Sequence, residues 1–167
     1  MTHGRLNQQL GKGFEQIFET MARYCGLTPI RCGHSCRVVA GGRLRLVPGQ
    51  LDWQLLTRDG RVAFVDTKSF ATDRFVYSDI DPAQLGRSAL YCEMGFVSGF
   101  VVWFRKPNLV GYFSGLRIAG EGPRSGFGPG DGVPLGRIES LDLKPLFHEQ
   151  EKDQEVDEEK VPVPAQR

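Results

Sequence analysis

The 167-residue sequence lacks a long hydrophobic run, a charged leader followed by an apolar stretch, and a dense set of cysteines. Its longest strongly apolar run, residues 95–104, is too short for a bilayer, which needs about 20 apolar residues. With no signal-like leader and only four cysteines, a secreted disulfide framework is not expected. We therefore expect a cytoplasmic protein without a membrane partner.

Three sequence motifs of well-known enzyme classes are also missing. The chain has no Gly-x-Gly-x-x-Gly fingerprint, no phosphate-binding Gly-Lys-Ser/Thr loop and no Gly-x-Ser-x-Gly nucleophile elbow. These absences argue against hydride transfer on a dinucleotide and against acyl transfer by a serine nucleophile.

The charge is distributed unevenly along the chain. The net charge is only +1, but residues 149–167 carry seven acids against three bases, which leaves 18 Lys and Arg against 13 Asp and Glu in residues 1–148. The tail cannot bury enough apolar surface to order itself. A basic body suits a polyanion such as nucleic acid, although scattered solvated arginines would give the same count.

A small group of cysteine and histidine residues allows a different interpretation. Cys25, Cys32, His34 and Cys36 supply enough soft ligands for a tetrahedral zinc site. Their spacing is not that of a standard zinc knuckle, and the simpler interpretation is that they are core, strand or loop residues. A zinc-stabilised interaction protein therefore stays open as a third interpretation of the chain.

The periodicity predicts the elements. Apolar residues three or four apart predict a first helix that ends near Gly26, and residues 29–42 predict an irregular loop or short strand. Residues 51–57 and 61–68 predict a hairpin closed by Arg58-Asp59-Gly60. Asp81 and Pro82 predict the start of a helix that runs to about Met94.

The second half of the chain completes the predicted architecture. Residues 96–104 and 109–113 predict a second hairpin, and the order helix, hairpin, helix, hairpin predicts an α/β fold with a mixed sheet flanked by helices. Residues 120–136 are rich in glycine and proline and predict a flexible loop, after which 141–147 form a short docking segment. We expect a core over 1–118, a loop and docking segment over 119–148, and a disordered acidic tail over 149–167.

The first predicted hairpin carries the most informative residues. If residues 58–60 form the loop, the antiparallel ladder places Asp52 directly opposite Asp66. Directly opposed like charges are unfavourable unless a cation lies between them, and hard oxygen ligands select Mg²⁺ or Mn²⁺. Lys68 emerges on the same face as Asp66 because strand side chains alternate.

These three side chains supply what phosphodiester hydrolysis requires. Carboxylates hold a metal that polarises phosphate and acidifies water, and a lysine orients the water or stabilises developing negative charge. The simpler interpretation is a solvated strand face with cross-strand pairing between Asp52, Asp66 and Lys68.

The context of these residues resembles a known family. Glu15 in a first helix, Asp52 on a strand, Asp66-Thr67-Lys68 on the next strand and Gln84 at the start of the following helix resemble the PD-(D/E)XK nuclease pattern. The arrangement over residues 11–113 is most similar to the small Holliday junction resolvases, RecU of bacteria and the Hjc-like archaeal and phage enzymes. Asp66 stands where glutamate is common, and Leu51 precedes Asp52 in place of proline.

The resemblance implies a restriction-endonuclease-like fold, a homodimer and Mg²⁺-dependent nicking of branched DNA, with Mn²⁺ as a substitute. It implies that Asp52, Asp66 and Glu15 hold the metal, with Glu19 as the rival acid for the helix position. Lys68 would position the attacking water, and Gln84 would support the lysine or a phosphate.

Several basic and aromatic residues are candidates for contacts to DNA. Arg37, Arg43, Arg45 and Arg74 are expected to bind phosphates. Phe75 and Tyr77 either stack on bases or pack inside the protein.

The sequence therefore predicts a structure-selective DNA endonuclease that resolves four-way (Holliday) junctions by phosphodiester hydrolysis. The alternatives are another PD-(D/E)XK nuclease of the repair or restriction type and a non-catalytic nucleic-acid-binding module.

Overall fold

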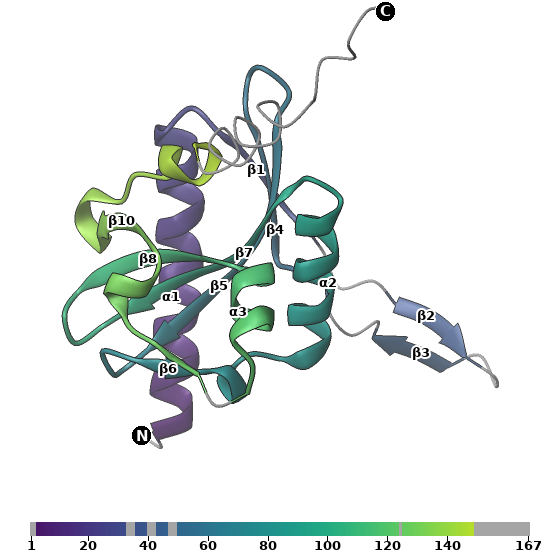
Figure 1. Cartoon of the computed structure of the whole chain (residues 1–167), viewed down its shortest axis with the longest axis horizontal. Helices are drawn as coiled ribbons and strands as arrows, with labels where there is room; N and C mark the ends of the chain where they lie inside the picture. The colour runs from purple at the N-terminus through teal and green to yellow at the C-terminus, as the bar shows by residue number, and fades with distance from the viewer. Residues whose placement is uncertain (1–2, 33–35, 40–42, 47–49, 124, 149–167) are drawn as a thin grey trace, which may run out of the picture.

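A six-stranded mixed sheet forms the centre of the structure, a computed structural model of the chain (Figure 1). Only the β5–β7 pair is parallel within this sheet, and the other neighbours are antiparallel. In spatial order the strands are β1 (Thr28–Arg31), β4 (Trp53–Leu56), β5 (Val62–Phe70), β7 (Val97–Phe104), β8 (Leu109–Ser114) and β10 (Val133–Arg137).

The structure describes residues 3–32, 36–39, 43–46, 50–123 and 125–148, and within 3–10, 36–39 and 43–46 it describes the backbone alone. The predicted acidic tail, 149–167, lies outside this range. None of the described helices has the length and apolar character that crossing a membrane requires.

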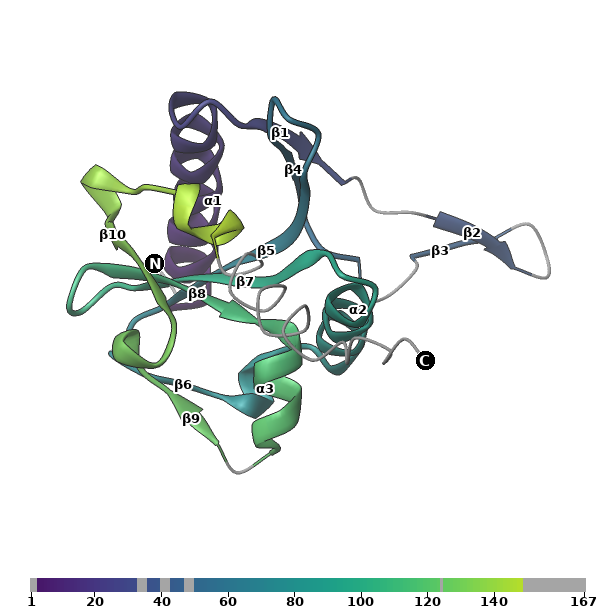
Figure 2. The same cartoon turned by 45° about the horizontal axis from the view of Figure 1, so that its top comes forward.

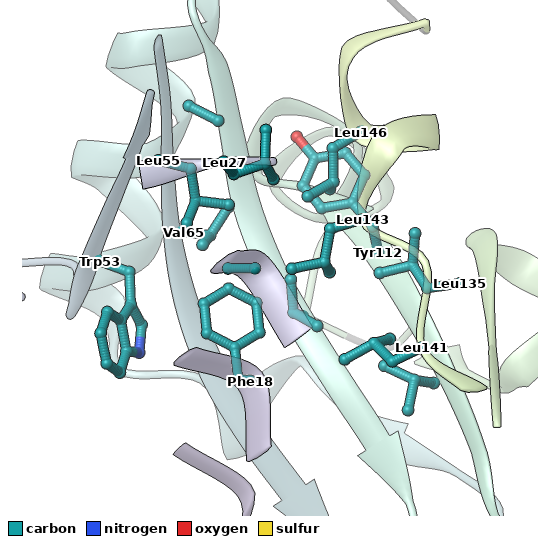
Figure 3. Close-up of a cluster of buried hydrophobic side chains, with 14 of the residues drawn as sticks. Phe18, Leu27, Trp53, Leu55, Val65, Tyr112, Leu135, Leu141, Leu143 and Leu146 are labelled. Carbon is teal, nitrogen blue, oxygen red and sulfur yellow. The ribbon is translucent and has the colours of Figure 1, made fainter. Parts of the chain in front are cut away.

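Helix α1 (His3–Tyr24) covers one face of the sheet. Phe14, Phe18 and Ala22 are buried on that side because they recur every four residues. The short helices η3 (Ile138–Ser140) and η4 (Lys144–Phe147) lie on the same face. Figure 3 shows Phe18, Trp53 and Val65 in one cluster with Leu141, Leu143 and Leu146 of this C-terminal segment, so the predicted docking segment is part of the core.

Two further helices, α2 (Pro82–Glu93) and α3 (Gly115–Glu121), cover the opposite face (Figures 1 and 2). A second aromatic-rich cluster fills this side, centred on Phe75, Phe100, Phe104 and Phe113. The smaller elements here are β6 (Phe75–Val76), η1 (Tyr77–Asp79), β9 (Gly126–Phe127) and η2 (Pro129–Asp131). The predicted fold class, an α/β chain whose mixed sheet is flanked by helices, is confirmed.

The predicted first hairpin is the β4–β5 pair. Thr57 N donates to Arg61 O at 3.0 Å, and Gly60 has φ +88°, the left-handed conformation that glycine adopts without strain. Strand β5 pairs with β4 only over Val62–Val65, but it continues beside β7 as far as Phe70. The stretch 66–70 therefore lies beyond the start of β4, and this is where the candidate site is found.

The prediction of a flexible loop over residues 120–136 is wrong. This stretch contains β9 and β10, and β10 pairs with β8 as an edge strand of the main sheet. Phe127 and Leu135 are each almost fully buried. Glycine and proline in this segment separate very short strands, so the composition does not reveal that Phe127 and Leu135 are buried.

Strands β2 (Cys36–Val39) and β3 (Arg43–Leu46) form a separate antiparallel ribbon, which projects from the body in both views (Figures 1 and 2). The ribbon contains three predicted phosphate-binding residues, and its register pairs Arg37 with Arg45 and Val39 with Arg43. Within 29–42, where the sequence predicts an irregular loop or short strand, the structure has the end of β1 and all of β2.

Candidate active site

The β4–β5 register brings the two predicted carboxylates to neighbouring strands. Trp53 pairs with Val65 at the last position of this ladder, so Asp52 and Asp66 occupy the next position on each strand. Asp52 is fixed from its other side, because Cys32 N donates to Asp52 O at 2.8 Å and extends the β1–β4 ladder by one residue. The sequence-based pairing of Asp52 with Asp66 thus agrees with the register of the hairpin.

Asp66 is fully buried, with 0% relative exposure, on the sheet face that α2 covers. The pKa of Asp66 is raised to about 8, first by burial and then by the adjacent Asp52 carboxyl, while the Lys68 ammonium acts in the opposite direction. Neither Asp66 oxygen receives a hydrogen bond of normal geometry from the described residues. Among the described residues the charge of Asp66 is compensated by the Lys68 ammonium, in an ion pair that lacks hydrogen-bond geometry.

Lys68 lies on the same face, two residues after Asp66. Its Nζ is 2.7 Å from Asp66 Oδ2, and its side chain is 25% exposed. The same ammonium donates to Gln84 Oε1 at 2.9 Å. The ammonium is thus held by a hydrogen bond to Gln84 and by an ion pair with Asp66.

Gln84 is oriented by a backbone group that sequence reasoning did not single out. Gln84 Nε2 donates to the carbonyl of Gln50 at 3.2 Å. Because the amide nitrogen points to this carbonyl, the amide oxygen of Gln84 faces Lys68. A backbone carbonyl carries no sequence signal, although Gln50 lies only two residues before Asp52.

The start of α2 brings Gln84 to this place. Asp81 is the N-cap, and its Oδ1 accepts from Ala83 N at 2.8 Å and from Gln84 N at 3.1 Å. Pro82 occupies the first turn, where its missing N–H costs nothing. Capping thus begins the helix at a residue that directs the Gln84 side chain toward β5.

Asp52, Asp66 and their surroundings fit a hard divalent cation. Mg²⁺ is usually held by one or two carboxylates together with waters and substrate phosphates. The two opposed aspartates supply such a pair, and the buried Asp66 oxygens have no other good donor among the described residues. Among the residues that the structure describes, no group of three or more His, Cys, Asp or Glu side chains is arranged to hold a metal ion.

Glu15 lies on α1, which covers the sheet face opposite to the α2 face that holds Asp66. It is half-buried and forms an ion pair with Arg31 at the end of β1. Arg31 lies opposite Trp53 in the ladder, with its guanidinium carbon 4.8 Å from the centroid of the Trp53 ring. Glu19 pairs instead with Arg23, one turn along the helix. No described contact joins either acid to Asp66, so the role of Glu15 as a metal ligand stays a prediction.

The remaining predicted residues lie in two different settings. Arg74 is exposed and donates to Gly126 O at 3.2 Å. Phe75 is buried against Phe70, Phe104, Phe113 and Phe127, so it packs inside the protein and is not available to stack on bases. Tyr77 is half-buried and packs against the same cluster.

The cysteines occupy different ends of β1. Cys25 directly follows α1, and its Sγ lies 3.6 Å from Asp142 Oδ1. Cys32 directly follows β1, and its backbone N–H donates to Asp52 O. Burial, and after it the charge of Asp52, raises the pKa of the Cys32 thiol. His34 and the side chain of Cys36 lie outside the described residues, so the zinc interpretation stays a prediction.

No family model matches the chain, and no curated protein matches its sequence. The chain is similar in fold to several solved structures. One of them is Hjc, a Holliday junction resolvase from the archaeal hyperthermophile Archaeoglobus fulgidus, with a TM-score of 0.48 and 10% identity over 64% of this chain and 78% of that chain. A likeness at this score and identity carries no information about the reaction, which has to be inferred from the side chains of this chain.

Proposed function

We propose that this chain is a metal-dependent nuclease that hydrolyses phosphodiester bonds in DNA. The observation that supports it best is the cluster of Asp52, Asp66, Lys68 and Gln84, in which a buried carboxylate faces a second carboxylate and an ammonium. A divalent cation bound by the two aspartates would polarise the phosphate and lower the pKa of an attacking water.

Lys68 has a separate role in this proposal. An ion pair with Asp66 Oδ2 and a hydrogen bond to Gln84 Oε1 hold its Nζ, which leaves N–H donors for the water or for a phosphate oxygen. Because the positive charge acts on negative charge that develops in the transition state, Lys68 contributes more to the rate than to DNA binding. Gln84 positions the lysine and, through Gln50, ties its orientation to the start of β4.

We further propose that the substrate is a four-way DNA junction. The basic body suits backbone contacts without base readout, and Arg37, Arg43, Arg45 and Arg74 remain the proposed phosphate-binding residues. A two-fold homodimer would present two identical sites to two arms of one junction. Mg²⁺ is the proposed ion, held by Asp52, Asp66 and Glu15, with Mn²⁺ as a substitute.

The test is incubation of the whole chain with labelled four-way junction, linear duplex and flap DNA, each with and without Mg²⁺. We expect cleavage of the junction in Mg²⁺ alone, and a dimer in sizing chromatography of the DNA complex. Equal cleavage of linear duplex would contradict the proposed junction specificity and would favour a repair or restriction-type nuclease. DNA binding without any cleavage in Mg²⁺ or Mn²⁺ would leave a non-catalytic binding module.

A further inference from the structure

Arg87 on α2 is a half-buried arginine that has no hydrogen-bond or ion-pair partner among the described residues. Its Nε atom is buried and receives no acceptor there. A guanidinium is always charged, and it is costly to remove from water without an acceptor. A bound group that carries an acceptor would remove this cost at the buried Nε.

The register of α2 against β5 places Arg87 level with the catalytic carboxylates. Gln84 contacts Lys68 at 2.9 Å, and the rings of Tyr91 and Phe64 lie 4.4 Å apart. The helix therefore runs antiparallel to β5, and these two contacts span about 10 Å of helix against about 13 Å of strand. Arg87 lies between them on the helix, as Asp66 lies between Lys68 and Phe64 on the strand.

Helical spacing puts Arg87 on the side of α2 that faces β5. Residues 84, 87 and 91 are separated by three and four positions and share one stripe of the helix. The neighbouring stripe, with Leu85 and Ser88, is buried, and Ser88 Oγ contacts Ser98 Oγ of β7 at 3.0 Å. The Arg87 stripe therefore follows the strand that carries the candidate site.

Arg87 lies at the same height along the α2–β5 packing as this site, but it does not pair with Asp52 or Asp66. No ion pair joins it to a described carboxylate, and the charge that opposes the rise in the pKa of Asp66 is that of Lys68. An arginine in this position offers a planar set of donors that matches two oxygens of a phosphate group.

We propose that Arg87 binds a backbone phosphate of the DNA strand that occupies the Asp52–Asp66 site. This inference rests on the proposed function, since the phosphate belongs to the bound nucleic acid. Arg87 thereby positions the strand along α2, while Lys68 and the aspartates act at the bond that is cleaved. The assignment adds a fifth arginine to those expected from the sequence and places it beside the reacting groups.

The experiment measures the affinity of the full chain for a labelled four-way junction in EDTA, over a series of KCl concentrations. Arg87→Met keeps the aliphatic stem but removes the charge, and Arg87→Lys keeps the charge. Arg117→Met is the matched control, because Arg117 lies on the exposed side of α3 and pairs with Glu121. Thermal unfolding of each variant verifies that it folds, and cleavage in Mg²⁺ is measured in parallel.

We expect Arg87→Met to weaken binding roughly tenfold, as for a lost hydrogen bond to a charged group. The slope of log affinity against log salt should fall in magnitude by about 1. Arg87→Lys should keep the wild-type slope, and Arg117→Met should change neither quantity.

A wild-type slope and affinity in Arg87→Met would overturn the inference, and continued cleavage by the wild type would leave the proposed function standing. A slope that falls in Arg87→Lys as well would also overturn it, because the charge would then not be the cause. If the wild type binds but does not cleave and Arg87→Met still loses slope, the phosphate contact is supported and the proposed nuclease activity fails. If the wild type does not bind the junction, both fail.

Discussion

The protonation of Asp66 links the candidate site to the stability of the protein. Its pKa is raised to about 8 in the folded chain, from an ordinary value of 3.8. Between these two values the folded state holds a proton that the unfolded state has released, so the free energy of unfolding should fall as pH rises. Binding of a cation to the deprotonated pair would offset this loss.

We therefore expect the wild-type chain in EDTA to unfold at a lower temperature at pH 8 than at pH 5. Asp66→Asn should flatten this dependence, because the amide does not titrate, and Mg²⁺ at pH 8 should restore stability only in the wild type. Thermal unfolding monitored by circular dichroism checks the result. Asp73→Asn is the control, since Asp73 is exposed and lies in a surface ion pair with Lys106. An unchanged pH dependence in Asp66→Asn would contradict the protonation of Asp66.

Glu15 and Glu19 can be distinguished by their effect on the metal. The ion pair of Glu15 involves an Arg31 side chain that is 58% exposed, and such pairs contribute at most about 1 kcal/mol to stability. We expect Glu15→Gln to leave the unfolding temperature almost unchanged but to raise the Mg²⁺ concentration for half-maximal cleavage at least about tenfold. Glu19→Gln is the matched control, and the opposite pattern would transfer the role to Glu19.

For individual residues, the sequence predicts part of the candidate site and misses another part. Asp52, Asp66 and Lys68 follow from counting along a hairpin, because antiparallel pairing and alternation are fixed once the turn is known. The Gln50 carbonyl is missed because every residue has one. The proposed role of Arg87 does not follow from the sequence, because it depends on how α2 packs against β5 through side chains.

Among the secondary-structure elements, α2 carries Gln84 and the proposed phosphate-binding Arg87. The geometry of the site therefore depends on how α2 packs against α3 and the sheet. Gly115, the first residue of α3, touches α2 so closely that an added Cβ would lie 2.1 Å from Ser88 Oγ and 2.9 Å from the Ser88 carbonyl carbon. Because backbone is among the atoms met, a rotamer change of Ser88 cannot relieve the contact.

Gly115→Ala should therefore destabilise the chain by about 1–3 kcal/mol and lower cleavage, because α2 must move away with Gln84. Urea unfolding and junction cleavage measure the two effects. Gly120→Ala is the control, since its Cβ would meet nothing within 4 Å and alanine favours a helix. Equal stability of Gly115→Ala and the wild type would contradict the close contact between the helices.

The elements that the sequence predicts are those with strong local signals. The capped helix at Asp81 and the hairpin at Gly60 each have a turn or cap residue next to an apolar pattern. Helix α3 and strand β10 were missed because they are short and interrupted by glycine. Their stability comes from tertiary burial of residues such as Ile118 and Leu135, which local periodicity does not reveal.

At the scale of the whole molecule, the acidic segment 149–167 opposes the basic body. Deleting it changes the formal charge from +1 to +5. We expect the truncated chain to fold and to bind a junction more tightly than the whole chain at low salt. This difference in affinity should shrink as the salt concentration rises, because the electrostatic screening length becomes shorter. A full-length variant whose seven tail acids are replaced by their amides should behave in the same way. An unfolded truncation, or unchanged affinity at low salt, would contradict this account.

The most direct test of the central claim is cleavage of a labelled four-way junction in Mg²⁺ by the wild type and by Asp66→Asn, with binding measured in EDTA on the same preparations. The amide keeps the shape of the carboxylate but loses the charge that would hold the metal, and loss of metal assistance should cost at least roughly a hundredfold in rate. The account predicts this loss with junction affinity within about twofold of the wild type, because Asp66 is not among the proposed phosphate-binding residues. Cleavage by Asp66→Asn at the wild-type rate would contradict it.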